Sequence, residues 1–391
     1  RVRSSAASDV YKRQVIMKIG ILTFHYAHNY GAMLQAYALS TWLNNNGYDA
    51  VIIDYRLPFI YDNHRKFTFR QFVKYYRSNN NLLFSFLKAA KNYRTHRNFC
   101  RMVKWTRFED FLNNILRKTD YIESIEQINQ LGLDTIICGS DQIWNEKLTG
   151  GYIPLYFAEG IKKSINRISY AASTGDNSVE SDKVHCFCSL LTNFDHISVR
   201  EKGLSDFMNL KGVTNQLVLD PIFLLEDVQW KKIERLPIES DYVMTYSFGE
   251  TPHFFEKAQD ISRRLNKKMI CFLFSPHKNI PKSAIQYYSG GPQEFLGYFS
   301  KASFVITNSF HGTAFSILYK KQFICIPPQR GRERTDSILS LLGLCGRIIE
   351  DYQAIGELRP IDYKQVYSTL ELLRNQSKSY LEKSLQLGGN K

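Results

Sequence analysis

The stretch from Phe304 to Pro327, FVITNSFHGTAFSILYKKQFICIP, constrains the fold more than any other part of the chain. Strand-forming residues occupy 304–307, and the polar turn after them holds residue types that let a strand end and a helix begin. The pattern then predicts a helix over 313–319 and a second strand over 322–326. It therefore indicates a βαβ unit, and with it an α/β fold that contains a parallel sheet.

The turn of this unit is the first candidate site. It places His311 beside Gly312 at the start of a helix, where free N–H groups and the helix dipole favour an anion. Asn308, Ser309 and Thr313 add an amide and two hydroxyl groups. A plain core unit with a loop histidine is the alternative, but the geometry of such a turn requires none of these polar groups. We therefore expect an anion to bind here.

Length and composition suggest two globular domains. Residues 1–16 show no apolar period and resemble a translated cloning scar, so we expect the native chain to begin at Met17. About 375 residues then remain, which is too many for one hydrophobic core. The chain contains no run of about 18 apolar residues, so the sequence predicts no membrane-spanning helix.

The seven cysteines are scattered and mostly lie inside apolar runs. This distribution is typical of reduced cysteines in a cytoplasmic protein, which is where we expect this chain to function. Cys186 and Cys188 are two residues apart, but no second pair accompanies them. We therefore expect no metal site.

A basic segment carries most of the net charge of +14, because residues 65–107 contain twelve Lys or Arg and no Asp or Glu. Aromatic residues alternate with these cations. Such a segment suits contact with an anionic membrane, at the inner face for a cytoplasmic protein. A solvated helical insertion whose aromatic residues pack inward is an equal alternative. Nucleic acid ranks below both, because no recognisable binding module accompanies the charge.

The first half of the chain opens with another βαβ pattern, a strand over 18–24, a helix over 32–43 and a strand over 51–55. Its first turn is not GxGxxG, which argues against a dinucleotide. Further strands over 133–138 and 195–200 end in polar residues. In an open α/β sheet these strand ends face the ligand, so we take the residues around them as candidates for the site.

A second α/β set begins at Tyr242, after a predicted linker over 221–240. These patterns predict an N-terminal Rossmann-like domain over 17–225, interrupted by a helical insertion at about 56–118. A C-terminal Rossmann-like domain over 226–350 and a helical tail over 351–391 follow. Two such domains that face each other across a cleft, with a final helix that can cross back, are the GT-B architecture.

Six motifs occur in a fixed order along the chain: NYGAMLQAYAL, GSDQIWN, RISYAAS, SVRE, VLDP and TNSFHGTAFS, with a basic LLGL loop after the last. Together they resemble the polysaccharide pyruvyl transferase family, from Met17 to about Gly346. The resemblance implies a GT-B-like fold and a pyruvyl (ketal) transfer. In that reaction the pyruvyl group of phosphoenolpyruvate passes to two hydroxyls of a sugar in a capsular or other cell-surface polysaccharide precursor, and phosphate is released.

The implied reaction assigns roles to residues. Phosphoenolpyruvate is a co-substrate that needs a planar cation, helix N–H groups and an acid for its methylene carbon, and we expect no other cofactor. Arg200 is the expected cation, His311 the expected proton donor or phosphate ligand, and Asp141 a candidate acceptor of the hydroxyl proton. The remaining predicted donor contacts are Asn308, Ser309, Gly312, Thr313, Arg332 and Arg334. The predicted acceptor contacts are Asn29, Tyr30, Gly31, Gln35, Ser140 and Trp144.

The chain departs from the family at one position. The family motif around the histidine often reads Arg-Leu-His-Gly, whereas Ser309 and Phe310 precede His311 here. The donor site thereby lacks one cation, which Arg332 or Arg334 can replace. Two other functions stay open, a GT-B glycosyltransferase that uses a nucleotide sugar and a non-catalytic glycan- or lipid-binding protein. For the transferase, a lipid-linked oligosaccharide is the acceptor that agrees with the basic segment.

Overall fold

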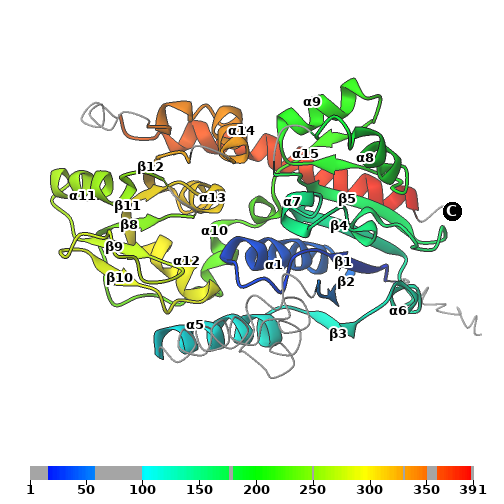
Figure 1. Ribbon diagram of the computed structural model, residues 1–391, viewed down its shortest axis with the longest axis horizontal. Coiled ribbons are helices and arrows are strands. Elements are labelled where there is room, and N and C mark those ends of the chain that lie inside the picture. Colours follow the sequence, from blue (N-terminus) through cyan, green and yellow to red (C-terminus); the bar gives the residue numbers. More distant parts are fainter. Residues whose placement is uncertain are drawn as a thin grey trace, which may run out of the picture.

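The computed structural model describes residues 16–57, 99–175, 179–248, 251–328, 331–349 and 359–388. Within these ranges the strands form two parallel sheets, and each sheet packs with helices into a domain of its own (Figure 1). The predicted leader lies outside the described residues except for Ile16. So does most of the basic segment, at 58–98.

The N-terminal domain holds a seven-stranded sheet in the order β3-β2-β1-β4-β5-β6-β7, counted over the described residues. Its strands are β1 Lys18–Leu22, β2 Asp49–Tyr55, β3 Lys118–Ile122, β4 Thr135–Asp141, β5 Asn166–Ala172, β6 Ser198–Val199 and β7 Gln216–Leu217. Its helices include α1 Tyr30–Asn45, α5 Phe99–Asp110, α6 Ile125–Asn129, α7 Glu146–Thr149, α8 Val184–Leu191 and α9 Lys202–Leu210. The short helices η1 Phe111–Ile115, η2 Pro154–Phe157 and η3 Pro221–Leu224 complete it.

The C-terminal domain holds a sheet in the order β10-β9-β8-β11-β12. Its strands are β8 Tyr242–Tyr246, β9 Met269–Phe272, β10 Ile285–Tyr287, β11 Ala302–Thr307 and β12 Gln322–Cys325. Around them lie α10 Asp227–Lys231, α11 Phe254–Arg264, α12 Pro292–Lys301, α13 Phe310–Leu318, α14 Glu333–Leu341 and η4 Cys345–Arg347. The unit β11-α13-β12 is the predicted βαβ unit, with both strands parallel and in register from Phe304 to Thr307.

Both sheets reverse their strand order beside the first strand of the domain. In the N-terminal sheet the reversal lies between β1 and β4, and in the C-terminal sheet between β8 and β11. Loops at the carboxyl ends of such strand pairs diverge, which is where open α/β sheets bind ligands. Residues 23–29, 139–145, 247–248, 251–253 and 308–309 therefore occupy the expected positions for a site.

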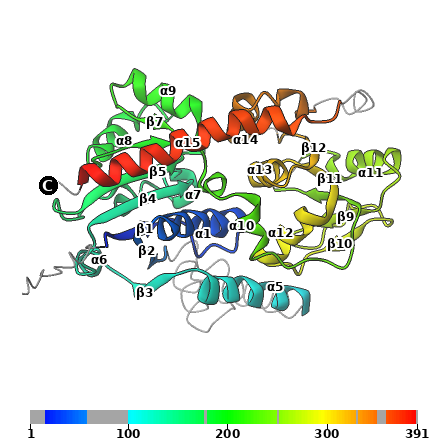
Figure 2. The same ribbon diagram turned by 180° about the vertical axis from the view of Figure 1, so that it is seen from behind.

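The C-terminal helix α15 Tyr363–Gly388 crosses back from the second domain to the first, as the sequence predicted (Figures 1 and 2). At its start the Tyr367 hydroxyl donates to the carbonyl oxygen of Leu318, at 2.8 Å. Near its end the Tyr380 hydroxyl donates to the carbonyl oxygen of Ser169, at 2.9 Å. The helix thus ties both domains together on one side of the molecule.

Helix α5 ties the domains together on the opposite side (Figure 1). The Lys104 ammonium donates to the carbonyl oxygen of Phe274 at 3.0 Å, and Arg107 Nη1 donates to the Tyr287 hydroxyl at 2.8 Å. These two cations of the basic segment thus face the C-terminal domain. Among the residues that the structure describes, no helix has the length and apolarity that a membrane crossing requires.

The predicted linker is partly a core element. Ile222 and Phe223 in η3 are fully buried, and η3 packs against α1. The composition of 221–240 predicted a linker, because acidic and polar residues follow Pro221. Its first residues instead fill the space beneath α1.

Candidate active site

The two domains meet where α1 and α13 begin. His311, in the first turn of α13, packs against Gly31 in the first turn of α1. A Cβ atom at position 31 would lie 2.0 Å from Nδ1 of His311, so only glycine leaves room for this imidazole. The contact joins a residue predicted for the acceptor with one predicted for catalysis, and it brings the two strand-to-helix turns together.

The His311 ring is buried, with 7% of the residue exposed, and its Nε2 atom has no hydrogen-bond partner. Burial lowers the pKa of His311 to about 4, and Arg200 and Arg334 act in the same direction. The carboxylates of Asp220 and Asp141 oppose them. At neutral pH the side chain is therefore an uncharged imidazole with a free nitrogen, which can accept a proton or a ligand hydrogen bond.

Arg200 lies near His311, since its charge helps to lower the pKa of the imidazole. The Phe310 ring contacts both side chains. The ring centroid of Phe310 is 5.0 Å from that of His311 and 5.3 Å from Cζ of Arg200. The Arg200 side chain is 2% exposed, and its Nη1 atom donates to Oδ2 of Asp220 at 2.6 Å. Its Nε atom donates to Oε1 of Glu201 at 3.1 Å.

Asp141 completes a ring of three carboxylates around Arg200, at 3.4 Å from Nη2 to Oδ1. Burial alone would lower the pKa of Arg200, but these carboxylates raise it, so the guanidinium stays charged. The sequence predicted Arg200 as the planar cation that binds the donor. In the structure both terminal nitrogens of its guanidinium group are already paired, Nη1 with Asp220 and Nη2 with Asp141.

The pKa values of Asp141 and Glu201 shift in opposite directions. Burial would raise the pKa of Asp141, but nearby charges, above all Arg200, lower it, so Asp141 is ionised. Burial raises the pKa of Glu201, although Ser173 Oγ donates to its Oε1 at 2.6 Å. Asp141 also has a φ of 67°, a left-handed conformation that costs a non-glycine residue about 1–3 kcal/mol and occurs often at functional sites.

Arg334 brings a second cation to the site. Its Cζ atom lies 5.9 Å from the centroid of the Phe310 ring, which also contacts Arg200 and His311. With the Gln142 amide oxygen turned toward it, Nη2 donates at 2.7 Å and Nη1 at 3.1 Å, whereas Nε has no partner. Arg332 instead pairs with Asp336 at 2.7 Å. Of the two predicted replacement cations, Arg334 is the one that lies at the site.

The other predicted donor residues shape the turn before α13. Ser309 is the N-cap of the helix and Gly312 lies against Thr307, where a Cβ atom would come within 2.2 Å of Oγ1. Thr313 is fully buried. Asn308 is buried too, and its amide oxygen accepts from the backbone N–H of Phe248 at 2.7 Å.

The predicted acceptor residues divide into two groups. Asn29 caps α1, with its Oδ1 atom 2.9 Å from the N–H of Gly31, and Ser140 Oγ donates to Asp220 at 3.2 Å. Both lie at the site. Tyr30 and Gln35 are fully buried, the former donating to the carbonyl oxygen of Gly290 at 3.0 Å.

Trp144 requires a correction. It is 1% exposed, its Nε1 atom donates to the carbonyl oxygen of Tyr156 at 3.0 Å, and its ring stacks on Phe157. It is a core residue of the N-terminal domain and offers no surface to an acceptor. The aromatic residue of the GSDQIWN motif thus anchors the turn that carries Asp141.

The sequence interpretation missed Glu201, Asp220, Phe310 and Gln142 as members of the site. Three of them carried a visible signal. Glu201 lies two residues after the end of β6, Asp220 lies three residues after the end of β7, and Gln142 lies next to Asp141. Phe310 gave no such signal, because it is apolar and contacts the guanidinium groups of Arg200 and Arg334 through its ring.

Comparison with solved structures agrees with this architecture. The UDP-GlcNAc 2-epimerase from Neisseria meningitidis bound to UDP-GlcNAc has a TM-score of 0.50 at 12% identity, covering 95% of this chain and all of that one. The 2-epimerase from Rickettsia bellii has a TM-score of 0.49 at 9% identity, covering 95% and 98%. An alpha-glucosyltransferase in complex with UDP and DNA gives 0.46 at 11%, covering 95% and 100%. The likeness to the Neisseria meningitidis enzyme, together with the two parallel-sheet domains, confirms the predicted GT-B-like fold.

No curated protein matches the chain. The family model of the polysaccharide pyruvyl transferases, however, matches residues 29–330, which include Gly31, Asp141, Arg200 and His311. This match covers most of the chain and both domains. The chain therefore belongs to the polysaccharide pyruvyl transferase family and is a transferase.

Proposed function

We propose that the protein moves the pyruvyl group of phosphoenolpyruvate onto two hydroxyls of a sugar in a capsular or other cell-surface polysaccharide precursor, and releases phosphate. The observation that carries the proposal is the Nε2 atom of the buried His311, which has no hydrogen-bond partner and lies near two guanidinium groups and two carboxylates. A site that both moves protons and binds an anion suits an anionic donor that must be protonated on carbon.

Arg334 is the cation that we assign first to the donor. Its Nε atom has no partner, and Gln142 is a neutral partner that an anion can replace. Arg200 adds a second positive charge near Arg334. Its Nη2 atom can turn from Asp141 to the donor, because this contact, at 3.4 Å, is the longest that Arg200 makes with a carboxylate. The N–H groups at the start of α13 supply further donors to a phosphate or carboxylate.

His311 is the proposed proton donor, although it is uncharged in the free protein. Negative charge of bound phosphoenolpyruvate would favour the imidazolium, because an opposite charge nearby raises the pKa of histidine. The imidazolium then gives its proton to the methylene carbon, and a sugar hydroxyl bonds to the adjacent carbon. Asp141 or Glu201 takes the proton of that hydroxyl. The second hydroxyl closes the ketal as the C–O bond to phosphate breaks, and its proton leaves with phosphate.

The sugar that receives the pyruvyl group would lie against the N-terminal domain, beside Asn29 and Ser140. A lipid-linked oligosaccharide would bring the reaction to the inner face of the membrane, and the basic segment 65–107 would supply the contact with anionic lipid. The charge count of that segment supports this part of the proposal, with twelve cations and no acid.

Ligand-dependent thermal stability tests the donor. Phosphoenolpyruvate at 100 times its dissociation constant should raise the free energy of unfolding by about 2.7 kcal/mol, and a panel of nucleotide sugars at the same concentration should not. Stabilisation by a nucleotide sugar alone would support a glycosyltransferase. If neither class of ligand stabilises the protein, a non-catalytic binding protein becomes the better interpretation.

Phosphate release tests the role of His311. Loss of a positioned acid costs roughly 10² to 10⁴ in rate, so His311→Ala should lose most phosphate release from phosphoenolpyruvate and acceptor while its far-ultraviolet circular dichroism stays unchanged. His185→Ala changes an exposed histidine of α8 and serves as the matched control. A folded His311→Ala protein with a near wild-type rate would contradict the assignment.

A further inference from the structure

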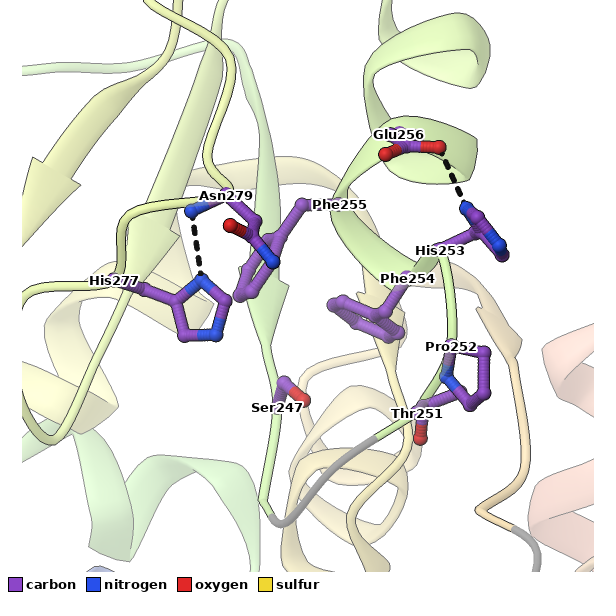
Figure 3. Close-up of a pocket in the computed structure, with 9 residues that line it drawn as sticks. All are labelled: Ser247, Thr251, Pro252, His253, Phe254, Phe255, Glu256, His277 and Asn279. Carbon is purple, nitrogen blue, oxygen red and sulfur yellow. Dashed lines mark hydrogen bonds and ion pairs between the residues drawn. The ribbon is translucent and has the colours of Figure 1, made fainter.

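A cavity of about 360 Å³ opens beside the proposed donor site, in the C-terminal domain. It lies between residues 251–256, at the start of α11, and residues 277 and 279, after β9. Figure 3 shows Thr251 and Pro252 on one side, His277 and Asn279 on the other, and Phe254, Phe255 and Ser247 between them. The cavity is at the carboxyl end of the sheet, on the same edge as the turn that holds His311.

Asn308, in the turn before α13, contacts two residues that line this cavity. Its Nδ2 atom donates to the Ser247 hydroxyl at 3.0 Å and to the Thr251 hydroxyl at 2.8 Å, and both of these residues line the cavity. Asn308 is also three residues before His311. Asn308 thus joins the lining of the cavity to the turn that carries His311, and a ligand that reached from one to the other would pass this amide.

The lining has the chemistry of a site for an uncharged polyol. Ser247, Thr251 and Asn279 contribute hydroxyl and amide groups, which can both donate and accept hydrogen bonds. His277 accepts from the backbone N–H of Asn279 at Nδ1, which leaves Nε2 as a donor in the neutral ring. Groups of this kind pair with the hydroxyls of a sugar, each of which also donates and accepts.

Charge argues against a phosphate-bearing ligand. None of the described residues that line the cavity is Lys or Arg, and Glu256 places a carboxylate in the first turn of α11, where the helix dipole would otherwise favour an anion. Phe254 and Phe255 are only 2% and 9% exposed, so they leave a narrow apolar floor. A stacked nucleobase needs an open ring face, whereas the small C–H face of a pyranose fits such a floor.

We propose that this cavity is an acceptor subsite that holds an uncharged pyranose ring of the glycan, adjacent to the sugar that receives the pyruvyl group. The inference rests on the proposed function for the identity of that glycan. It adds a second sugar to the recognised acceptor, so the protein would select an oligosaccharide over a single sugar.

Saturation-transfer NMR with five probes tests the subsite: uridine, and the methyl glycosides of glucose, galactose, mannose and N-acetylglucosamine. At least one glycoside should receive saturation from the wild-type protein. Asn279→Trp should remove that signal by filling the cavity, and Asn279→Ala should weaken binding by roughly 2- to 10-fold, the effect of one lost neutral hydrogen bond. Lys278→Ala, at an exposed neighbour outside the cavity, should leave the signal unchanged.

Three outcomes would overturn the subsite: no glycoside signal, a signal that persists in Asn279→Trp, or saturation of uridine in place of every glycoside. Thermal stabilisation by phosphoenolpyruvate is measured on the same samples and separates the two proposals. Glycoside binding without any effect of phosphoenolpyruvate would leave the subsite standing and overturn the proposed donor. Stabilisation by phosphoenolpyruvate without glycoside binding would do the reverse.

Discussion

At the scale of single residues, His311 links the site to the stability of the protein. Burial lowers its pKa to about 4 in the folded protein, against about 6.5 in an unfolded chain. Between these values the unfolded state binds more protons, so the free energy of unfolding falls as the pH falls from 6.5 to 4. The loss from this group is up to about 3 kcal/mol, and urea unfolding at a series of pH values measures it.

The variant His311→Asn isolates this contribution, because it removes the titrating group and keeps a polar side chain of moderate size. Its free energy of unfolding should fall less steeply over the same pH range than that of the wild type. His185→Asn, at an exposed position of α8, should keep the wild-type slope. Equal slopes in all three proteins would mean that His311 is not buried in its neutral form.

The variant Gly31→Ala tests the contact that Gly31 makes with His311 between the two domains. Gly31→Ala places a methyl group 2.0 Å from the present position of His311 Nδ1, so the imidazole must move. Displacements of about 1 Å at a catalytic group can cost on the order of 100-fold in rate, and we expect a fall in kcat of that size. Gly346→Ala has open space around the new methyl group and should leave kcat unchanged. Unchanged kcat in Gly31→Ala would show that His311 needs no fixed position.

Sequence reasoning found the polar residues at strand ends, since Asp141, Arg200 and His311 all lie at the domain interface. It could not find their partners. The spacing from 200 to 220 does not reveal that Asp220 contacts Arg200, because two strands and a helix must first pack. Trp144 misled the interpretation for the same reason, since a tryptophan beside a candidate site looks equally suited to a sugar and to a core.

At the scale of elements, the predictions were best where the apolar period was unbroken. The strand and helix of the organising βαβ unit match β11 and α13 to within three residues, and α1 and α15 were similarly visible. Strand β6 is shorter than predicted, at Ser198–Val199, because His196 forms only an isolated bridge with Ile168 and the ladder resumes at Ser198. Helix α5 had no predicted partner, since its contacts with the C-terminal domain join residues about 170 apart.

Helix α15 offers a matched pair of leucines that tests its packing against both domains. Leu370 is fully buried in the core, whereas Leu372 is 65% exposed on the same helix. Leu370→Ala should lower the free energy of unfolding by about 2–5 kcal/mol, and Leu372→Ala by less than about 0.5 kcal/mol. Urea unfolding measures both. Equal effects would mean that α15 does not pack as the structure has it.

At the scale of the whole molecule, two helices on opposite sides hold the domains together. Helix α15 joins them through hydrogen bonds from Tyr367 and Tyr380, and α5 joins them through Lys104 and Arg107. Burial lowers the pKa of Lys104 to about 7, and its ammonium lies 4.3 Å from the Phe274 ring centroid. These two cations of the basic segment serve the domain interface, so a membrane contact has to use the cations before them in the sequence.

Membrane contact is therefore tested with cations from residues 65–98. Each Lys or Arg near an anionic surface contributes roughly 1 kcal/mol, so replacing Lys88, Lys91 and Arg94 by Gln should weaken vesicle binding on the order of 100-fold. Replacing the exposed Lys162, Lys163 and Lys232 by Gln removes the same charge elsewhere and should have little effect. Co-sedimentation with anionic and neutral vesicles at low and high salt measures both variants. Binding that ignores lipid charge and salt, or equal losses in the two variants, would show that the segment does not hold the protein at the membrane.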